Sequence, residues 1–345
     1  MRGLFNIDVN LHTPIYKQLL SEFERLIEAG ELRVGECLPS MNKLSAQLNI
    51  SKETVKKVYS ILRERGIIES FHGKGFFVLS RQEKRKLKIF LLLDKLSQYK
   101  QILYDAFIAK MGDKADVTIY LYDQNVDAFE EFVNRALDND YDYYIITPHF
   151  PLDVAIQSRV LKTLKRIPNR KLVMLDHWLR SLPGNYGAVY QDIANDIYGG
   201  LNEAIEDLAR YKKLHVVILP SSLYGSLITA AVTRFCEDKG IEVAFHYEIN
   251  EEMMQKGGVY LLLNGQLGIG IVEIARMAKS LELEIGKDIG IISYNDSYLS
   301  EVILGGLTTV STDFEQMGHL AAEMVLTHNL CKIKCDFKLK RRSTF

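Results

Sequence analysis

Short, almost wholly apolar runs recur along the chain between residues 87 and 294. Amphipathic segments separate them, and most of the intervals are roughly 25 to 40 residues long. Strands covered on both faces are continuously apolar, and parallel strands are joined by long crossovers that are usually helices. The pattern therefore predicts an α/β body of two similar lobes, each a parallel sheet covered by helices. The predicted strands are 87–94, 117–123, 143–147, 171–176, 215–220, 243–249, 259–264 and 289–294.

The first eighty residues have a different pattern. Apolar residues at helical spacing predict one helix that Gly30 ends and a short second helix that Ser40 caps. Ser51 caps a third helix so soon after the second that the two must cross steeply, as in a helix-turn-helix. Two β-rich runs, 67–71 and 76–79, flank a glycine-containing turn and predict a hairpin. The amino-terminal part is therefore expected to be a winged helix-turn-helix.

Charge is distributed unevenly along the chain, although the formal net charge is only −1. Residues 1–86 contain 15 lysines and arginines against 10 acidic residues, and the remaining residues contain 28 against 34. The outward side of the third predicted helix carries Lys52, Lys56 and Lys57. A basic head on an acidic body is typical of a protein that binds a polyanion at one end. Such a helix fits the major groove of double-stranded DNA, where lysines contact phosphates and the first turn reaches base edges.

Fixed spacings across residues 12–79 resemble the DNA-binding pattern of the GntR family of bacterial regulators. The resemblance rests on GECLPS at 35–40, LSAQL at 44–48, SKETV at 51–55, LRERG at 62–66 and GKGFFV at 73–78. Lys52 stands where arginine is usual, and residues 41–43 replace a charged pairing, so the base preference of relatives is not carried over. The resemblance implies phosphate, base or wing contacts by Ser40, Ser51, Lys52, Thr54, Lys56, His72 and Gly73, and the other candidate DNA-binding residues are Asn42, Lys43, Lys57 and Lys74.

Polar side chains gather where the predicted strands of the body end. A ligand of a parallel α/β sheet binds beyond the carboxyl ends of the strands. Carboxylates and amides exchange hydrogen bonds with vicinal hydroxyls, and an aromatic ring covers the apolar side of a sugar, so a carbohydrate site is expected. Any one of these side chains alone could equally cap the next helix, and Trp178 could equally belong to the core. They are Asp94, His149, Asp176, Trp178, Asn264, Asn295 and Asp296.

The body also resembles the sensor module of the LacI/GalR repressors, which is similar to type I periplasmic sugar-binding proteins. The likeness rests on NGQLGIG at 264–270, IGIISYND at 289–296, LTTV at 307–310, MG at 317–318 and RRST at 341–344. It implies effector contacts at Asp176, Asn264, Asn295 and Thr312. Ser226 stands where the family usually has an arginine that grips ligand hydroxyls. A GntR-type head on a LacI-type body resembles the arabinose-repressor type of regulator.

The expected organisation is a winged helix-turn-helix domain over 1–79, a charged linker over 80–87 and an effector-binding domain over 88–345. The expected function is sequence-specific DNA binding by a regulator of carbohydrate utilisation that acts as a repressor. Its partners are expected to be double-stranded operator DNA, a sugar or sugar derivative held between the lobes, and a second copy of the chain. We expect a cytoplasmic protein with reduced cysteines, no cofactor, no metal and no membrane span, because the apolar runs are too short and the cysteines too scattered.

Four alternatives remain open. The effector could be a metabolite other than a sugar, since the expected arginine is missing. The head could carry a helical acid-binding or an aminotransferase-like body, although strand alternation and length argue against both. A purely architectural DNA binder would not need polar strand ends. A dinucleotide-dependent enzyme is the remotest, because the glycine pattern at 264–270 lacks its third glycine and lies late in the chain.

Overall fold

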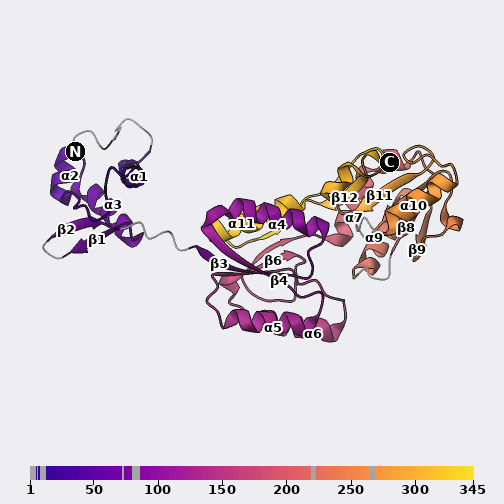
Figure 1. The fold of residues 1–345 in the computed structure, drawn as a ribbon, viewed down its shortest axis with the longest axis horizontal. Coiled ribbons are helices and arrows are strands. Elements are labelled where there is room, and N and C mark those ends of the chain that lie inside the picture. The colour runs from indigo at the N-terminus through magenta and orange to yellow at the C-terminus, as the bar shows by residue number, and fades with distance from the viewer. Residues whose placement is uncertain are drawn as a thin grey trace. The chain divides into compact units, whose positions relative to one another are not determined.

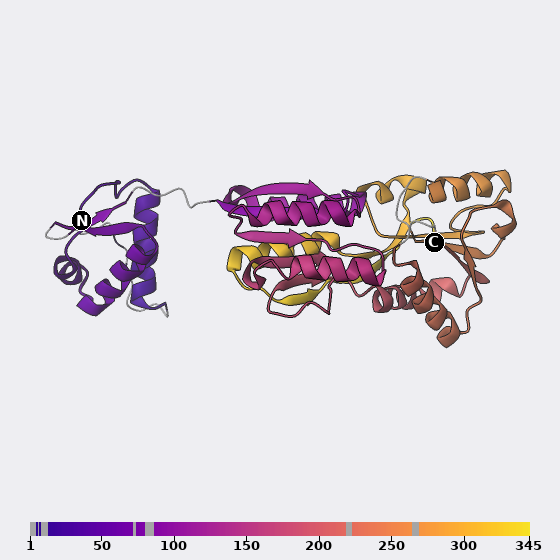
Figure 2. The same cartoon turned by 90° about the horizontal axis from the view of Figure 1, so that it is seen from below.

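The computed structural model describes residues 5, 7, 13–71, 74–79, 86–218, 223–263 and 269–345. The chain divides into two units, Met1–Lys86 and Leu87–Phe345, and both are drawn in Figures 1 and 2. Among these described residues, no helix is both long and apolar enough to span a bilayer.

The first unit is built from three helices and a hairpin. They are α1 (Ile15–Glu28), α2 (Met41–Leu48), α3 (Lys52–Glu64), β1 (Ile68–Phe71) and β2 (Gly75–Val78). The hairpin is antiparallel, with Ile68 opposite Val78. Three residues join α2 to α3, and the first of them, Asn49, has a φ of 52°, a left-handed conformation that asparagine tolerates well. This tight turn makes the two helices cross, so the predicted winged helix-turn-helix is confirmed.

A single apolar core holds the first unit together. Leu19, Phe23 and Leu26 of α1 are buried against the inner face of α3. The Tyr59 ring lies edge-on to the rings of Phe23 and Phe76, and its hydroxyl donates to the Pro39 carbonyl oxygen at 2.7 Å. These contacts fix α3 against the hairpin and leave its other side to solvent.

The first lobe of the second unit contains a six-stranded sheet. Its strands, in spatial order, are β13 (Lys332–Lys334), β7 (Gly187–Tyr190), β6 (Leu172–Asp176), β5 (Tyr143–Ile146), β3 (Leu87–Leu93) and β4 (Ala115–Leu121). All neighbours in this sheet are parallel. Figure 1 shows α4 (Gln98–Met111) and α11 (Phe314–Thr327) side by side on one face of the sheet, and α5 (Val126–Leu137) and α6 (Val154–Leu164) on the other.

The two helices on the first face are in very close contact. A Cβ added to Gly318 of α11 would lie 2.3 Å from the Leu103 carbonyl oxygen of α4 and 2.9 Å from the Ala106 Cβ. Only glycine lets the backbones approach so closely. The position of α4, and of every side chain that it carries toward the sheet, is therefore fixed by α11.

The second lobe repeats this arrangement. Its strands, in spatial order, are β14 (Phe337–Lys340), β12 (Thr308–Thr312), β11 (Gly290–Tyr294), β10 (Gly258–Leu262), β8 (Lys213–Val217) and β9 (Val243–His246). Helices α7 (Ile193–Glu203) and α9 (Gly225–Lys239) pack on one face, and α10 (Ile269–Ser280) packs on the other. The short helix α8 (Ile205–Leu208) precedes β8. The predicted two-lobed α/β fold is confirmed.

The chain passes between the lobes after β7, after β12 and after β13, so that the last segments of the chain lie in both lobes (Figure 2). Hydrogen bonds tie these crossovers together. The Cys335 amide donates to the Tyr190 carbonyl oxygen, and the Asp313 amide donates to that of Asp336, both at 2.8 Å. The three crossovers therefore form one connected hinge between the lobes.

Two features of the sheets differ from the prediction. Strands β7, β12, β13 and β14 are absent from the predicted set, and β14 pairs with β12 in antiparallel orientation. The run of β12 is polar in sequence, yet its threonines are buried, because Thr308 donates to and accepts from Arg342 backbone groups. The prediction looked for apolar runs, whereas the polar side chains of β12 are buried because a segment distant in sequence supplies their hydrogen bonds.

Candidate functional site

The outer face of the first unit carries most of the candidate residues for DNA contact. Ser40 and Ser51 are the N-caps of α2 and α3, where their hydroxyl oxygens accept from the amides of Lys43 and Thr54. Helix N-termini attract phosphate because their free amides and dipole favour negative charge. Two such termini therefore lie on a face that also carries exposed lysines. Ser40, Asn42, Lys43, Ser51, Lys52 and Lys56 are exposed, and Thr54 is half-buried.

Other candidates of the first unit are arranged differently. The Lys57 ammonium lies 3.7 Å from the centre of the Tyr16 ring on α1, a cation–π contact that draws it toward α1. Lys56 forms a long ion pair with Glu53 at 3.8 Å, and both side chains are largely exposed. Lys74 is exposed in the hairpin turn. His72 and Gly73, at the tip of the predicted wing, lie outside the described residues.

In the second unit, two strand-end carboxylates of the first lobe meet around a lysine that the sequence prediction missed. Asp94 follows β3, Asp176 ends β6, and Lys100 comes from the first turns of α4. All three side chains are at most 1% exposed. The Lys100 ammonium donates to Asp94 Oδ1 and lies 3.4 Å from Asp176 Oδ2. A buried charge is tolerated only when it is paired in this way.

The ion pairs decide which protonation states these groups hold. Burial by itself would raise the pKa of Asp176, but the positive charge of Lys100 and hydrogen bonding hold that pKa well below its ordinary value. Burial by itself would lower the pKa of Lys100, and the neighbouring acidic groups raise that pKa above its ordinary value instead. Near neutral pH, Asp176 is therefore a carboxylate and Lys100 an ammonium.

His149 extends this cluster. It follows β5, and its Nδ1 lies 3.7 Å from Asp176 Oδ2, which is too long for a hydrogen bond. The Tyr224 ring of the second lobe packs edge-on against the His149 ring, with centroids 4.8 Å apart, and stacks on the His177 ring at 5.0 Å. Burial lowers the pKa of His177. Aromatic side chains of both lobes therefore meet beside Asp176.

The hinge reaches the same place through Gln191. Its amide nitrogen donates to Asp176 Oδ1, and its carbonyl oxygen accepts from the Thr312 hydroxyl at 3.1 Å and, more weakly, from the Tyr294 hydroxyl at 3.5 Å. Thr312 and Tyr294 end strands of the second lobe. Gln191 therefore connects the buried carboxylate of one lobe to the strand ends of the other.

Several buried polar atoms of this region have no hydrogen-bond partner among the described residues. They include Asp94 Oδ2, Asp176 Oδ2, His149 Nδ1, the Tyr224 hydroxyl and Asn295 Oδ1. Buried polar atoms are nearly always hydrogen-bonded, and exceptions call for a specific explanation. Such a set of unsatisfied atoms, contributed by both lobes at the carboxyl ends of their strands, is suited to receive a polar ligand.

Asn295 is the counterpart of Asp176 in the second lobe. It follows β11, which has the same position in its sheet as β6 has in the first. The φ angles of the two residues are 72° and 69°. Both are short polar residues of the kind that tolerates left-handed backbone. The chain thus turns in the same way at equivalent strand ends of the two lobes.

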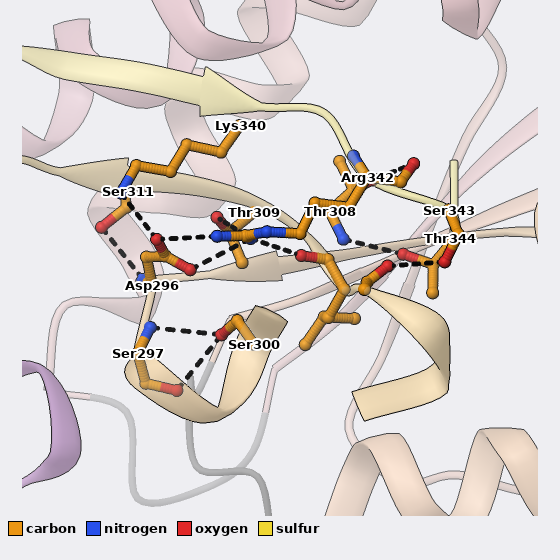
Figure 3. A network of polar contacts seen from close by, with 12 residues as sticks. Asp296, Ser297, Ser300, Thr308, Thr309, Ser311, Lys340, Arg342, Ser343 and Thr344 are labelled. Carbon is orange, nitrogen blue, oxygen red and sulfur yellow. Dashed lines mark hydrogen bonds and ion pairs between the residues drawn. The ribbon is translucent and has the colours of Figure 1, made fainter. Parts of the chain in front are cut away.

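Asp296, the next predicted site residue, belongs to a different network (Figure 3). Its carboxylate accepts from both terminal nitrogens of Arg342 at 3.2 Å and from Lys340 at 2.7 Å. Thr344, from the same C-terminal motif, accepts from the Thr308 amide and donates to the Ile291 carbonyl oxygen. The RRST motif at 341–344 thus fastens the C-terminal segment onto β11 and β12, and the Asp296 carboxylate serves that attachment.

The remaining predicted effector residues are Trp178, Ser226 and Asn264. The Trp178 ring is half-buried against the Tyr190 ring, with centroids 4.9 Å apart, and its indole nitrogen donates to Tyr186. Ser226 is exposed in the first turn of α9. Asn264 lies outside the described residues.

The residues of the cluster that were absent from the prediction include Lys100, Gln191 and Tyr224. Lys100 had a signal in the sequence, because it falls three residues before Leu103 and seven before Phe107, on the face of α4 that is buried. A lysine on the apolar side of a helix needs a buried partner. Gln191 and Tyr224 had no comparable signal, since each acts through contacts with residues distant in the sequence.

One family model matches within each of the two units of the chain. Residues 15–78 match the bacterial regulatory proteins of the gntR family, and residues 250–329 match the periplasmic binding protein-like domain. The chain is similar to the HTH-type transcriptional repressor YtrA of Bacillus subtilis (strain 168). The two are 30% identical over 106 residues, which are 31% of this chain and 81% of YtrA. The HTH-type transcriptional regulator TreR of the same organism is 39% identical over 75 residues, which are 22% of this chain and 30% of TreR.

Solved structures resemble mainly the second unit. The dimeric Lac repressor with an 11-residue C-terminal deletion superposes with a TM-score of 0.60 at 18% identity, over 75% of this chain and 98% of that one. The trehalose repressor from Escherichia coli superposes with a TM-score of 0.59 at 10% identity, over 74% of this chain and 100% of that one. At these identities the likeness establishes the fold alone.

Proposed function

Because the chain belongs to the GntR family of bacterial regulatory proteins and is a transcription regulator with a LacI-type body, we propose that it represses genes of carbohydrate utilisation. Its affinity for operator DNA is controlled by a small sugar or sugar derivative bound between the lobes of the second unit. The arabinose-repressor type is the closest description of this combination of head and body. The curated relatives are regulators and not enzymes, so a dinucleotide-dependent enzyme is set aside.

One observation supports the effector site above all others. Asp94 Oδ2, Asp176 Oδ2 and Asn295 Oδ1 are buried acceptors that receive no hydrogen bond from any residue that the structure describes, and they come from strand ends of both lobes. Sugar hydroxyls are hydrogen-bond donors, and carboxylate and amide oxygens accept from them. His149, Thr312 and Tyr224 are the other proposed contacts of the ligand. The sequence pattern alone proposes four more, Trp178, Ser226, Asn264 and Asp296.

The link between ligand and DNA is proposed to run through the hinge. Gln191 holds Asp176 of one lobe and accepts from Thr312 of the other, so a ligand that binds Asp176 acts on a residue that both lobes share. A ligand shifts an equilibrium between two lobe arrangements only by the difference in its affinity for them. In this proposal, Gln191 couples ligand binding at Asp176 to the arrangement of the two lobes.

DNA binding is assigned to the outer face of the first unit. A homodimer would present two α3 helices to the half-sites of a nearly palindromic operator. The capped N-termini of α2 and α3 and the exposed Lys52 and Lys56 support this assignment. The hairpin would lie over the adjacent minor groove. The similarity of the chain to the regulator TreR of Bacillus subtilis (strain 168) and to the trehalose repressor from Escherichia coli supports a carbohydrate effector.

Asp176→Asn tests the proposed effector site. Asparagine keeps the left-handed backbone of this position but removes the charge that receives ligand donors. With the neutral monosaccharide that raises the melting temperature most in a thermal-shift panel, we expect the variant's affinity for DNA to stop responding. The measurement is a fluorescence anisotropy titration on operator DNA with and without that sugar. Asp113→Asn, at an exposed residue of the same lobe, is the matched control, and an unaltered response of the Asp176 variant contradicts the site.

A further inference from the structure

Each of the two buried carboxylates of the first lobe accepts hydrogen bonds from described residues on one oxygen only, and the other oxygen of Asp176 lies 3.4 Å from the Lys100 ammonium. Asp94 Oδ1 accepts from Lys100 and, more weakly, from the Thr147 hydroxyl at 3.4 Å. Asp176 Oδ1 accepts from Gln191. Asp94 Oδ2 and Asp176 Oδ2 accept no hydrogen bond from any described residue. The protein thus holds both carboxylates in place and leaves one acceptor of each for something else.

The charge at this site is unbalanced. Two carboxylates face one ammonium, that of Lys100, and no other lysine or arginine of the described residues pairs with Asp94 or Asp176. His149 is the further group that could carry a positive charge, and its Nδ1 lies 3.7 Å from Asp176 Oδ2. The two carboxylates and the Lys100 ammonium together carry one net negative charge.

We propose that this site selects its effector by charge: the ligand presents hydroxyl or ammonium donors to Asp94 and Asp176 and carries no phosphate or carboxylate. The inference rests on the proposed function and names the class within it, neutral sugars, polyols and amino sugars, in preference to sugar phosphates and sugar acids. The anionic group of such a ligand would bring a second negative charge next to these acceptors and could not itself donate a hydrogen bond to either of them. A donor-rich ligand satisfies both.

The size of the discrimination follows from the charge. A phosphate or carboxylate roughly 6 Å from one net negative charge, at an effective dielectric constant of about 20, is disfavoured by about a hundredfold in its binding constant. A protonated amine at the same distance is favoured by a comparable factor before the cost of its desolvation. Charge should therefore outweigh small differences in ring stereochemistry.

The experiment compares matched ligands on the full-length protein. Thermal shift and isothermal titration calorimetry are run with glucose, glucosamine, glucose 6-phosphate and glucuronate, and with the corresponding galactose and ribose derivatives. We expect binding by a neutral or amino member of at least one set and about hundredfold weaker binding by its phosphate or acid. A phosphate or acid that binds as tightly as its parent sugar overturns the inference and leaves the proposed sugar response standing. If no ligand of any set binds, both this inference and the proposed sugar response are overturned.

A charge variant separates electrostatics from shape. Asp94→Asn keeps the size of the side chain and removes one negative charge, so we expect the preference for the neutral over the anionic ligand to fall at least tenfold. Circular dichroism establishes that the variant is folded, and Asp176→Asn is the second charge variant if it is not. A folded variant whose preference is unchanged shows that the discrimination, if present, arises from steric fit, and this overturns the electrostatic inference.

Discussion

Replacing Lys100 by methionine should destabilise the second unit strongly and change the sign of its pH dependence. Methionine fills a similar volume but leaves Asp94 and Asp176 buried without their cation, since all three side chains are at most 1% exposed. Breaking a buried ion pair by removing one partner costs about 3–5 kcal/mol. For a unit of this size, 1 kcal/mol corresponds to about 2–4 °C, so we expect a melting temperature about 10 °C lower at pH 7.

The pH dependence follows from the direction of each pKa shift. In the unaltered protein the pKa of Asp176 is lowered, so its stabilisation is complete above the unfolded pKa of about 4 and is lost as the pH falls below it. Without Lys100, burial raises the pKa of the carboxyl groups above the unfolded value. Their contribution is then most favourable below pH 4 and is lost as the pH rises through the raised pKa.

Differential scanning calorimetry from pH 5 to pH 8 measures this difference, with Lys110→Met, at an exposed residue of the same helix, as the control. The difference in melting temperature between the Lys100 variant and the unaltered protein should become smaller as the pH falls. Because histidines titrate in both proteins, their contribution cancels in the difference between the two melting temperatures. A gap below about 1 °C, or one that widens toward acid pH, would refute the assignment of Lys100 as the counter-ion of the two carboxylates.

Three further outcomes are expected. Lys56→Ala should weaken binding to specific and random DNA alike and flatten the logarithmic salt dependence by about one unit, as measured by anisotropy; an unchanged slope removes Lys56 from the interface. Burial lowers the pKa of His215, whose Nδ1 lies 2.9 Å from His246 Nε2, to about 4. Stability from His215 is therefore complete above pH 6.5 and falls by about 3 kcal/mol toward pH 4, and urea unfolding should show a smaller loss in His215→Phe. Arg342→Ala should cost about 2–3 kcal/mol in the same assay, because it removes two charged hydrogen bonds from Asp296; a cost below 0.5 kcal/mol, on the order of a surface substitution, contradicts a structural role.

The elements that the sequence predicted well are those whose pattern is local. All three helices of the head, its hairpin and the eight apolar strands of the body follow from spacing within one segment. Strands β7, β12, β13 and β14 do not, because each gains its stability from partners distant in sequence. Val310 of β12 pairs with Leu339 of β14, and no local pattern announces that pairing.

The same distinction applies to the ligand site. Asp94, His149 and Asp176 could be identified because strand ends are positions that the fold itself marks. Gln191 and Tyr224 could not, because their importance comes from contacts with Asp176 and with the His149 ring. Asp296 follows a strand like the others, yet Arg342 draws its carboxylate away. The position of a residue along a strand predicts where its backbone lies in the sheet. It does not predict which residue its side chain contacts.

The matched left-handed turns at Asp176 and Asn295 have an evolutionary consequence. At a φ near 70°, few residues other than aspartate, asparagine and glycine fit without strain. A single mutation between aspartate and asparagine at either position would change the net charge offered to a metabolite and leave the path of the backbone as it was. Descendants of this regulator could therefore acquire new chemical preferences in steps of one charge, without first having to evolve a new scaffold.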